Sequence, residues 1–121
     1  SFDEQFTGWG WEDVEWGIRV SQRFEIVHID NTASHLGLDT AAALASKYEQ
    51  STQNFARIMQ RFPDEISELR LAKTARALRR VPGLVIWRRA LRRIAVGHVL
   101  PVSVRAFAMR LYRPALYAEV V

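Results

Sequence analysis

The chain has 121 residues, which is enough for one domain, and its 49% hydrophobic and 25% charged residues are typical of a folded globular protein rather than a disordered one. It contains no cysteine, which excludes disulfides, thiolate metal sites and a thiol nucleophile. The net charge of +4 is unevenly distributed: residues 1–69 carry 5 basic and 12 acidic residues, whereas residues 70–121 carry 12 basic residues and the single acid Glu119.

The first forty residues are predicted to form a loop, then a short helix and then a strand. Residues 1–10 are aromatic, acidic and glycine-containing, and show neither a helical nor a strand period. A helix is predicted from Trp11 to Ser21, because Glu12 and Asp13 would then lie in its first turn at the positive end of the helix dipole. Residues 24–29 are rich in β-branched side chains and predict a strand.

Four helices are predicted after the strand. Asp39 or Thr40 should cap a long helix that ends near Arg61, and a second should run from Pro63 to just before Pro82. A third is expected over 84–96, and a fourth from about 101, where Pro114 should bend or break it. One strand and four helices are an incomplete α/β arrangement, so we expect most of the sheet to lie upstream of Ser1, in a part of a longer protein.

The densest chemical signal is the segment Gly8–Asp13, which reads Gly-Trp-Gly-Trp-Glu-Asp. The two glycines let the backbone turn sharply and approach a ligand. The tryptophans offer flat apolar faces on which a sugar ring can stack, and the adjacent carboxylates can accept a hydroxyl proton. Taken singly, each tryptophan is also typical of a core anchor and each acid of a helix cap.

Together with the preceding Phe2-Asp3-Glu4, this segment resembles the acceptor-side motif of inverting family 2 glycosyltransferases and the related β-1,4-galactosyltransferases. The resemblance covers about the first third of the chain. It implies an α/β fragment that is mostly α, with 1–38 as the C-terminal piece of a GT-A nucleotide-sugar-binding domain and 39–121 as a helical C-terminal extension.

The resemblance also implies roles for individual residues. Asp13 falls on the catalytic base, Glu12 on a residue that orients the acceptor, and Trp9 on the position that stacks against it; Gly8, Gly10 and Trp11 complete the substrate-binding segment. His35 falls on a ligand of a divalent Mn or Mg ion. The Asp-x-Asp motif of these families is missing from the sequence. We therefore expect the donor site and most metal ligands outside these residues, and no activity from the 121 residues alone.

The leading hypothesis is inverting transfer of a sugar from a nucleotide-sugar donor to a glycan or lipid-linked acceptor, by a cytoplasmic enzyme that can be peripheral on the inner face of the membrane. The alternative is a non-catalytic basic helical module that binds a membrane surface or nucleic acid. Nucleic acid is disfavoured, because no recognised binding motif occurs and the aromatic residues cluster in the acidic half. A glycosidase is also disfavoured, since its two carboxyl groups must flank the bond about 5–10 Å apart.

The predicted helix over 84–96 has an apolar face that contains Trp87, next to a face formed by Arg88, Arg89, Arg92 and Arg93. A tryptophan-bearing apolar face flanked by arginines is typical of helices that lie in an anionic membrane interface. We therefore expect residues 70–113 to dock on such a surface. The alternative, that this helix packs on the catalytic domain with a solvated basic face, remains open at this stage.

Overall fold

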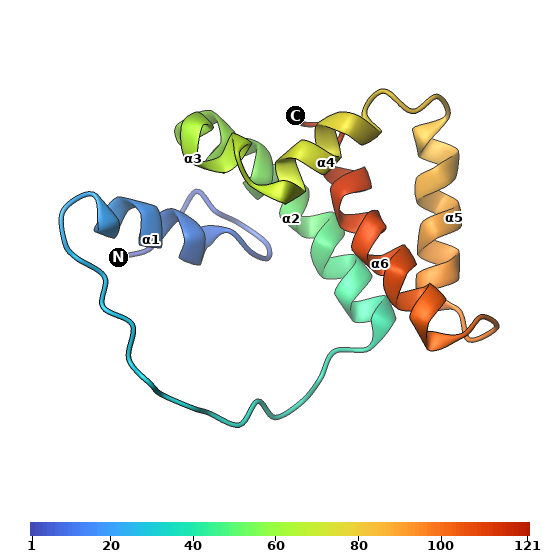
Figure 1. Ribbon diagram of the computed structural model, residues 1–121, viewed down its shortest axis with the longest axis horizontal. Coiled ribbons are helices and arrows are strands. Elements are labelled where there is room, and N and C mark those ends of the chain that lie inside the picture. The colour runs from blue at the N-terminus through green and yellow to red at the C-terminus, as the bar shows by residue number, and fades with distance from the viewer.

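The computed structural model describes residues 1–121 and is entirely helical (Figure 1). Its six helices are α1 (Glu12–Ser21), α2 (Ala41–Arg61), α3 (Pro63–Ser67), α4 (Arg70–Leu78), α5 (Leu84–Val96) and α6 (Val102–Tyr117). The predicted α/β fold is wrong, because the structure contains no strand and no sheet. None of the helices combines the length and apolar character that crossing a membrane requires.

The predicted strand over 24–29 is the specific error. These residues belong to an irregular, exposed connection between α1 and α2 that loops away from the rest of the molecule (Figure 1). Their β-branched side chains suit a pleated surface, but a strand also needs a neighbour to pair with its N–H and C=O groups. No other segment of the chain supplies that neighbour.

Most predicted helices are confirmed. The Thr40 hydroxyl caps α2 by accepting a hydrogen bond from the Ala43 N–H (3.1 Å), and α5 has the predicted bounds. The second predicted helix is divided into α3 and α4 at Leu69, whose extended backbone lets Ile66 and Ala72 reach the same core. Of the bend or break expected at Pro114, the break is wrong, because α6 continues to Tyr117.

The core consists of two clusters that share α6. This helix packs against α2, α4 and α5, while α5 forms one edge of the bundle and lies mainly against α6 (Figure 1). The first cluster joins the N-terminal segment to α2, α3, α4 and the end of α6, and the second joins the start of α2 to α5 and α6. The buried members are Trp11, Phe55, Ile58, Ile66, Ala72, Ala75 and Tyr117 in the first, and Ala45, Ala95, Ala108, Met109 and Tyr112 in the second.

Helix α1 is fastened to the bundle by a buried carboxylate. Glu15 is fully buried, and its carboxylate pairs with Arg19 (3.0 Å) one turn further along α1 and with Arg61 (3.2 Å) at the end of α2. Ile18 adds an apolar contact with the first cluster. Charge pairing therefore fixes the direction in which α1 leaves the turn that precedes it.

Candidate functional site

The turn that leads into α1 has an unusual backbone. Gly8 (φ 81°), Gly10 (φ 85°) and Trp11 (φ 77°) all lie in the left-handed region. Glycine adopts this conformation readily, but for a tryptophan it costs about 1–2 kcal/mol. Trp11 must therefore be held in place by its surroundings.

The hydroxyl of Tyr117 supplies much of that restraint. It accepts hydrogen bonds from Nε1 of Trp11 (3.0 Å) and from Nε of Arg113 (3.2 Å). With both acceptor positions used, its own proton points to Oγ of Ser51, which in turn donates to the Tyr48 carbonyl (2.8 Å). This chain of hydrogen bonds, the Tyr117 network, connects the turn to α2 and α6 inside the core.

Helix α2 also holds the turn directly. Nδ2 of the fully buried Asn54 donates to the carbonyl of Gly10 (2.9 Å). The ring of Trp11 packs against Phe55, with 5.1 Å between the ring centroids. Trp11 is therefore a core anchor that positions the turn, and only 6% of its surface is exposed.

The turn and the start of α1 border a hollow of about 270 Å³, which we call the α1 hollow; it is lined by Trp9, Gly10, Trp11, Glu12, Asp13, Val14 and Arg113. Five of the predicted acceptor-site residues thus come together in one place. Gly8 lies just outside, against Gln50 of α2. The half-buried Trp9 ring rests on Tyr48 (centroids 6.1 Å apart) and on the ammonium group of Lys47 (5.8 Å), which limits its rotation.

The two neighbouring carboxylates differ in their surroundings. Asp13 is exposed, and its Oδ1 accepts a hydrogen bond from the Val14 N–H (2.8 Å) in the first turn of α1, where the helix dipole stabilises negative charge. Glu12 is half-buried, and its Oε2 is buried without any hydrogen-bond partner in the chain. A buried carboxylate oxygen without a partner is costly, so Glu12 has an acceptor position free for a ligand.

Arg113 is a site residue that the sequence did not indicate. Its guanidinium carbon lies 5.4 Å from the Trp11 ring centroid, 5.1 Å from that of Tyr48 and 5.6 Å from that of Tyr117. It therefore brings a positive charge to the α1 hollow, which it lines together with Glu12 and Asp13. In the sequence Arg113 is one of twelve basic residues in the C-terminal half, and only the packing of α6 on the turn distinguishes it.

His35 is not brought to this site. It lies exposed in the connection between α1 and α2 and does not line the α1 hollow. No group of three or more His, Asp or Glu side chains that could hold a metal ion occurs in the structure. Because the resemblance places most ligands of the divalent ion outside these 121 residues, that ion stays a prediction.

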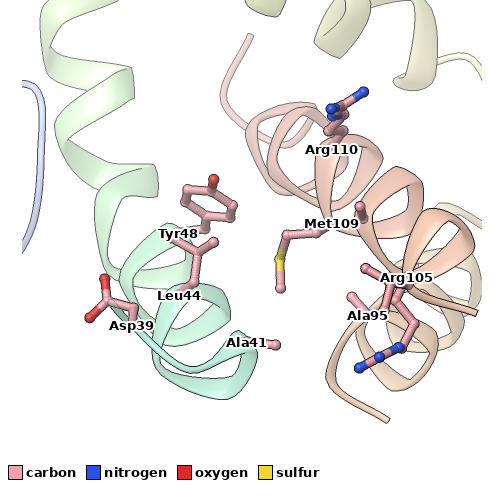
Figure 2. A pocket seen from close by; sticks show the side chains of 10 residues that line it. Asp39, Ala41, Leu44, Tyr48, Ala95, Arg105, Met109 and Arg110 are labelled. Carbon is pink, nitrogen blue, oxygen red and sulfur yellow. The ribbon is translucent and has the colours of Figure 1, made fainter. Parts of the chain in front are cut away.

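A second hollow, of about 420 Å³, lies between the first turns of α2 and α6 (Figure 2). Met109 points into the space between Tyr48 and Leu44 on one side and Ala95 on the other, while Arg110 points away from it. None of the predicted site residues lines this hollow. Its walls are mainly apolar, and two of its three charged side chains are already engaged: Asp39 pairs with Lys47, and Arg105 donates to backbone carbonyls.

Comparison with known proteins adds no relative: no protein-family model matches the chain, and no curated protein and no solved structure matches it either. The functional interpretation therefore depends on the residues of the α1 hollow.

Proposed function

We propose that the α1 hollow binds the acceptor sugar of a glycosyltransferase and that Asp13 is the general base of an inverting transfer from a nucleotide-sugar donor. One observation carries the proposal: an aromatic ring, an unpaired carboxylate oxygen and an exposed carboxylate line the same hollow. These groups belong to Trp9, Glu12 and Asp13.

Each group has a separate task in binding the acceptor. The apolar face of a sugar ring would stack on Trp9, whose orientation is restricted by Tyr48 and Lys47. Oε2 of Glu12 would accept a hydrogen bond from a sugar hydroxyl, which relieves the unpaired oxygen. Arg113, already placed beside the hollow, would donate to another sugar oxygen.

In the chemical step, Asp13 would take the proton of the acceptor hydroxyl while its oxygen forms a bond to the anomeric carbon of the donor. The bond from that carbon to the donor phosphate breaks on the opposite face, and the nucleotide diphosphate leaves with the electron pair. The product therefore has inverted configuration, and no enzyme nucleophile takes part. In this proposal the donor and its divalent ion are bound by residues outside the 121 described here.

The test is a transfer assay in the longer protein that supplies the donor site. Asp13→Asn should lower kcat by about 10²–10⁴-fold, the usual contribution of a general base, with donor binding unchanged. Its control is Asp64→Asn, which changes an exposed acid in the first turn of α3. Full turnover by the Asp13 variant would exclude Asp13 as the base.

Acceptor binding is tested separately with Trp9→Ala, which should raise the KM for the acceptor with a smaller change in kcat. The matched control is Trp16→Ala, because Trp16 lies on α1 beside Phe2 and does not line the hollow. Equal KM values for the two variants would show that the Trp9 ring does not contact the acceptor.

A further inference from the structure

Helix α5 and the loop that follows it expose large apolar side chains. Ile86 is 73% exposed and Trp87 59%, and in the loop that follows the helix Val99 is 95% and Leu100 40% exposed. Ile86 lies on the side of α5 opposite the buried Ala95, whereas Trp87 lies one turn before Leu91 on the stripe that packs in the second core cluster. Both Ile86 and Trp87 nevertheless keep most of their surface outside the core.

Two arginines accompany these apolar residues without any partner in the structure. Ile86, Arg89 and Arg93 follow one another at three- and four-residue spacing and so lie on one stripe of α5. The guanidinium groups of Arg89 and Arg93 are exposed and make no hydrogen bond or ion pair. Their positive charge is therefore available to an external anion.

The other two arginines of the predicted basic face are already engaged. Arg88 pairs with Glu119, and Nε of Arg92 pairs with Oε1 of Glu49 at 2.7 Å. Burial opposes ionisation of Glu49, but hydrogen bonds from Arg92 and Tyr112 outweigh it and lower the pKa of this carboxyl. The structure thus narrows the predicted four-arginine face to Arg89 and Arg93.

The end of α5 and the next loop form one surface. Arg93, Ile94, Gly97, Val99 and Leu100 together line a shallow apolar hollow of about 350 Å³. Arg105 fixes the loop by donating to the carbonyls of Leu100 (3.0 Å) and Gly97 (3.2 Å). The apolar side chains of the loop are therefore presented on a constrained backbone.

We propose that this surface docks the protein on an anionic lipid bilayer; its members, named here the α5 outer surface, are Ile86, Trp87, Arg89, Arg93, Val99 and Leu100. Arg89 and Arg93 would bind lipid phosphates, while the indole and the aliphatic side chains enter the boundary between headgroups and acyl chains. The proposal is independent of glycosyl transfer, because no residue of the α1 hollow takes part.

A bilayer fits these observations better than nucleic acid does. Binding to a phosphate backbone requires many cations along a groove, whereas this surface has two free arginines. Exposed isoleucine, valine and leucine contribute nothing to phosphate contacts but stabilise insertion into a membrane interface. The combination of few free cations and several exposed apolar side chains therefore favours lipid.

Co-sedimentation of the 121-residue chain with vesicles tests the proposal. We expect binding to phosphatidylcholine vesicles that contain about one third phosphatidylserine, and little binding to phosphatidylcholine alone. The double variant Arg89→Gln/Arg93→Gln should bind the anionic vesicles about 30-fold more weakly, which corresponds to about 1 kcal/mol for each arginine near the surface.

The matched control is Arg70→Gln/Arg80→Gln, which removes two other exposed arginines without partners and changes the net charge equally. Equal losses of vesicle binding for the two double variants would show that the attraction is spread over the whole basic half, and would overturn the proposal that α5 docks on the membrane. Tryptophan quenching by brominated acyl chains gives a second readout, which should largely disappear in Trp87→Phe. Unchanged quenching, or binding to a DNA duplex but not to anionic vesicles, would also overturn the proposal.

Discussion

Replacing Tyr117 with phenylalanine removes a single oxygen atom, the hydroxyl oxygen, from the site. The ring and its stacking on Phe55, with centroids 4.2 Å apart and planes 8° apart, are preserved, so no cavity forms. What disappears is the hydroxyl that accepts from Trp11 and Arg113 and donates to Ser51. The variant therefore measures the contribution of the Tyr117 network.

The expected magnitude follows from the groups left without a partner. Nε1 of Trp11 becomes a buried donor with no acceptor, which costs about 1–3 kcal/mol. Arg113 is partly exposed and Ser51 keeps its bond to the Tyr48 carbonyl, so both add less. We expect the free energy of unfolding to fall by about 2 kcal/mol, a large part of the about 5–15 kcal/mol typical of a domain.

Urea unfolding followed by circular dichroism checks this value. With an m-value of about 2 kcal/mol/M, the midpoint should move by about 1 M while m stays constant. Tyr48→Phe is the control, because the Tyr48 hydroxyl makes no hydrogen bond in the structure, and its effect should stay below about 0.5 kcal/mol. If Tyr117→Phe lowered the free energy of unfolding as little as this control, the Tyr117 hydroxyl would not hold the turn.

Two further predictions concern the turn and the pH dependence. Gly10→Ala should lower the free energy of unfolding by about 1–2 kcal/mol because φ is 85° there. Its control is Gly17→Ala within α1, which should raise the free energy of unfolding by up to about 1 kcal/mol because nothing lies within 4 Å of the new methyl group. Equal effects of the two variants in urea unfolding would contradict the left-handed turn. Burial and the hydrogen bond to Glu49 raise the pKa of Tyr112 to about 12, above the value of about 10 in an unfolded chain. The unfolded state therefore loses this proton first, and the free energy of unfolding should fall as pH rises from about 10 to 12. Tyr112→Phe should lessen that fall. An identical dependence of unfolding free energy on pH in the variant would show that the Tyr112 hydroxyl does not cause it.

Local signals predicted the helices well. Thr40 before the apolar stripe of α2 and Pro63 after it act on neighbouring residues, so capping and proline rules suffice to place the ends of α2. The strand over 24–29 failed because β-propensity describes how a side chain fits a sheet, not whether a neighbouring strand exists. That information is not contained in the six residues themselves.

The candidate site was predicted only in part, for a related reason. The segment Gly8–Asp13 was identified as a unit and the resemblance assigned acceptor stacking to Trp9, but nothing in the sequence showed that Trp11 is buried whereas Trp9 is half-buried beside the hollow. The difference arises from hydrogen bonds that join Trp11 and Ser51 to Tyr117, residues that are far apart in the chain. The same holds on α5, where Glu49 and Glu119 engage two of the four arginines that looked equivalent.

The central claim, that the α1 hollow binds a sugar, can be measured directly by NMR on the 121-residue chain. The probes are methyl glycosides of common hexoses and N-acetylhexosamines at millimolar concentration. At least one glycoside should shift the indole N–H signal of Trp9 and the amide signals of Gly10 and Asp13, while Trp16 stays unchanged. No shift with any glycoside, or shifts centred on Met109 in the hollow between α2 and α6, would contradict the account.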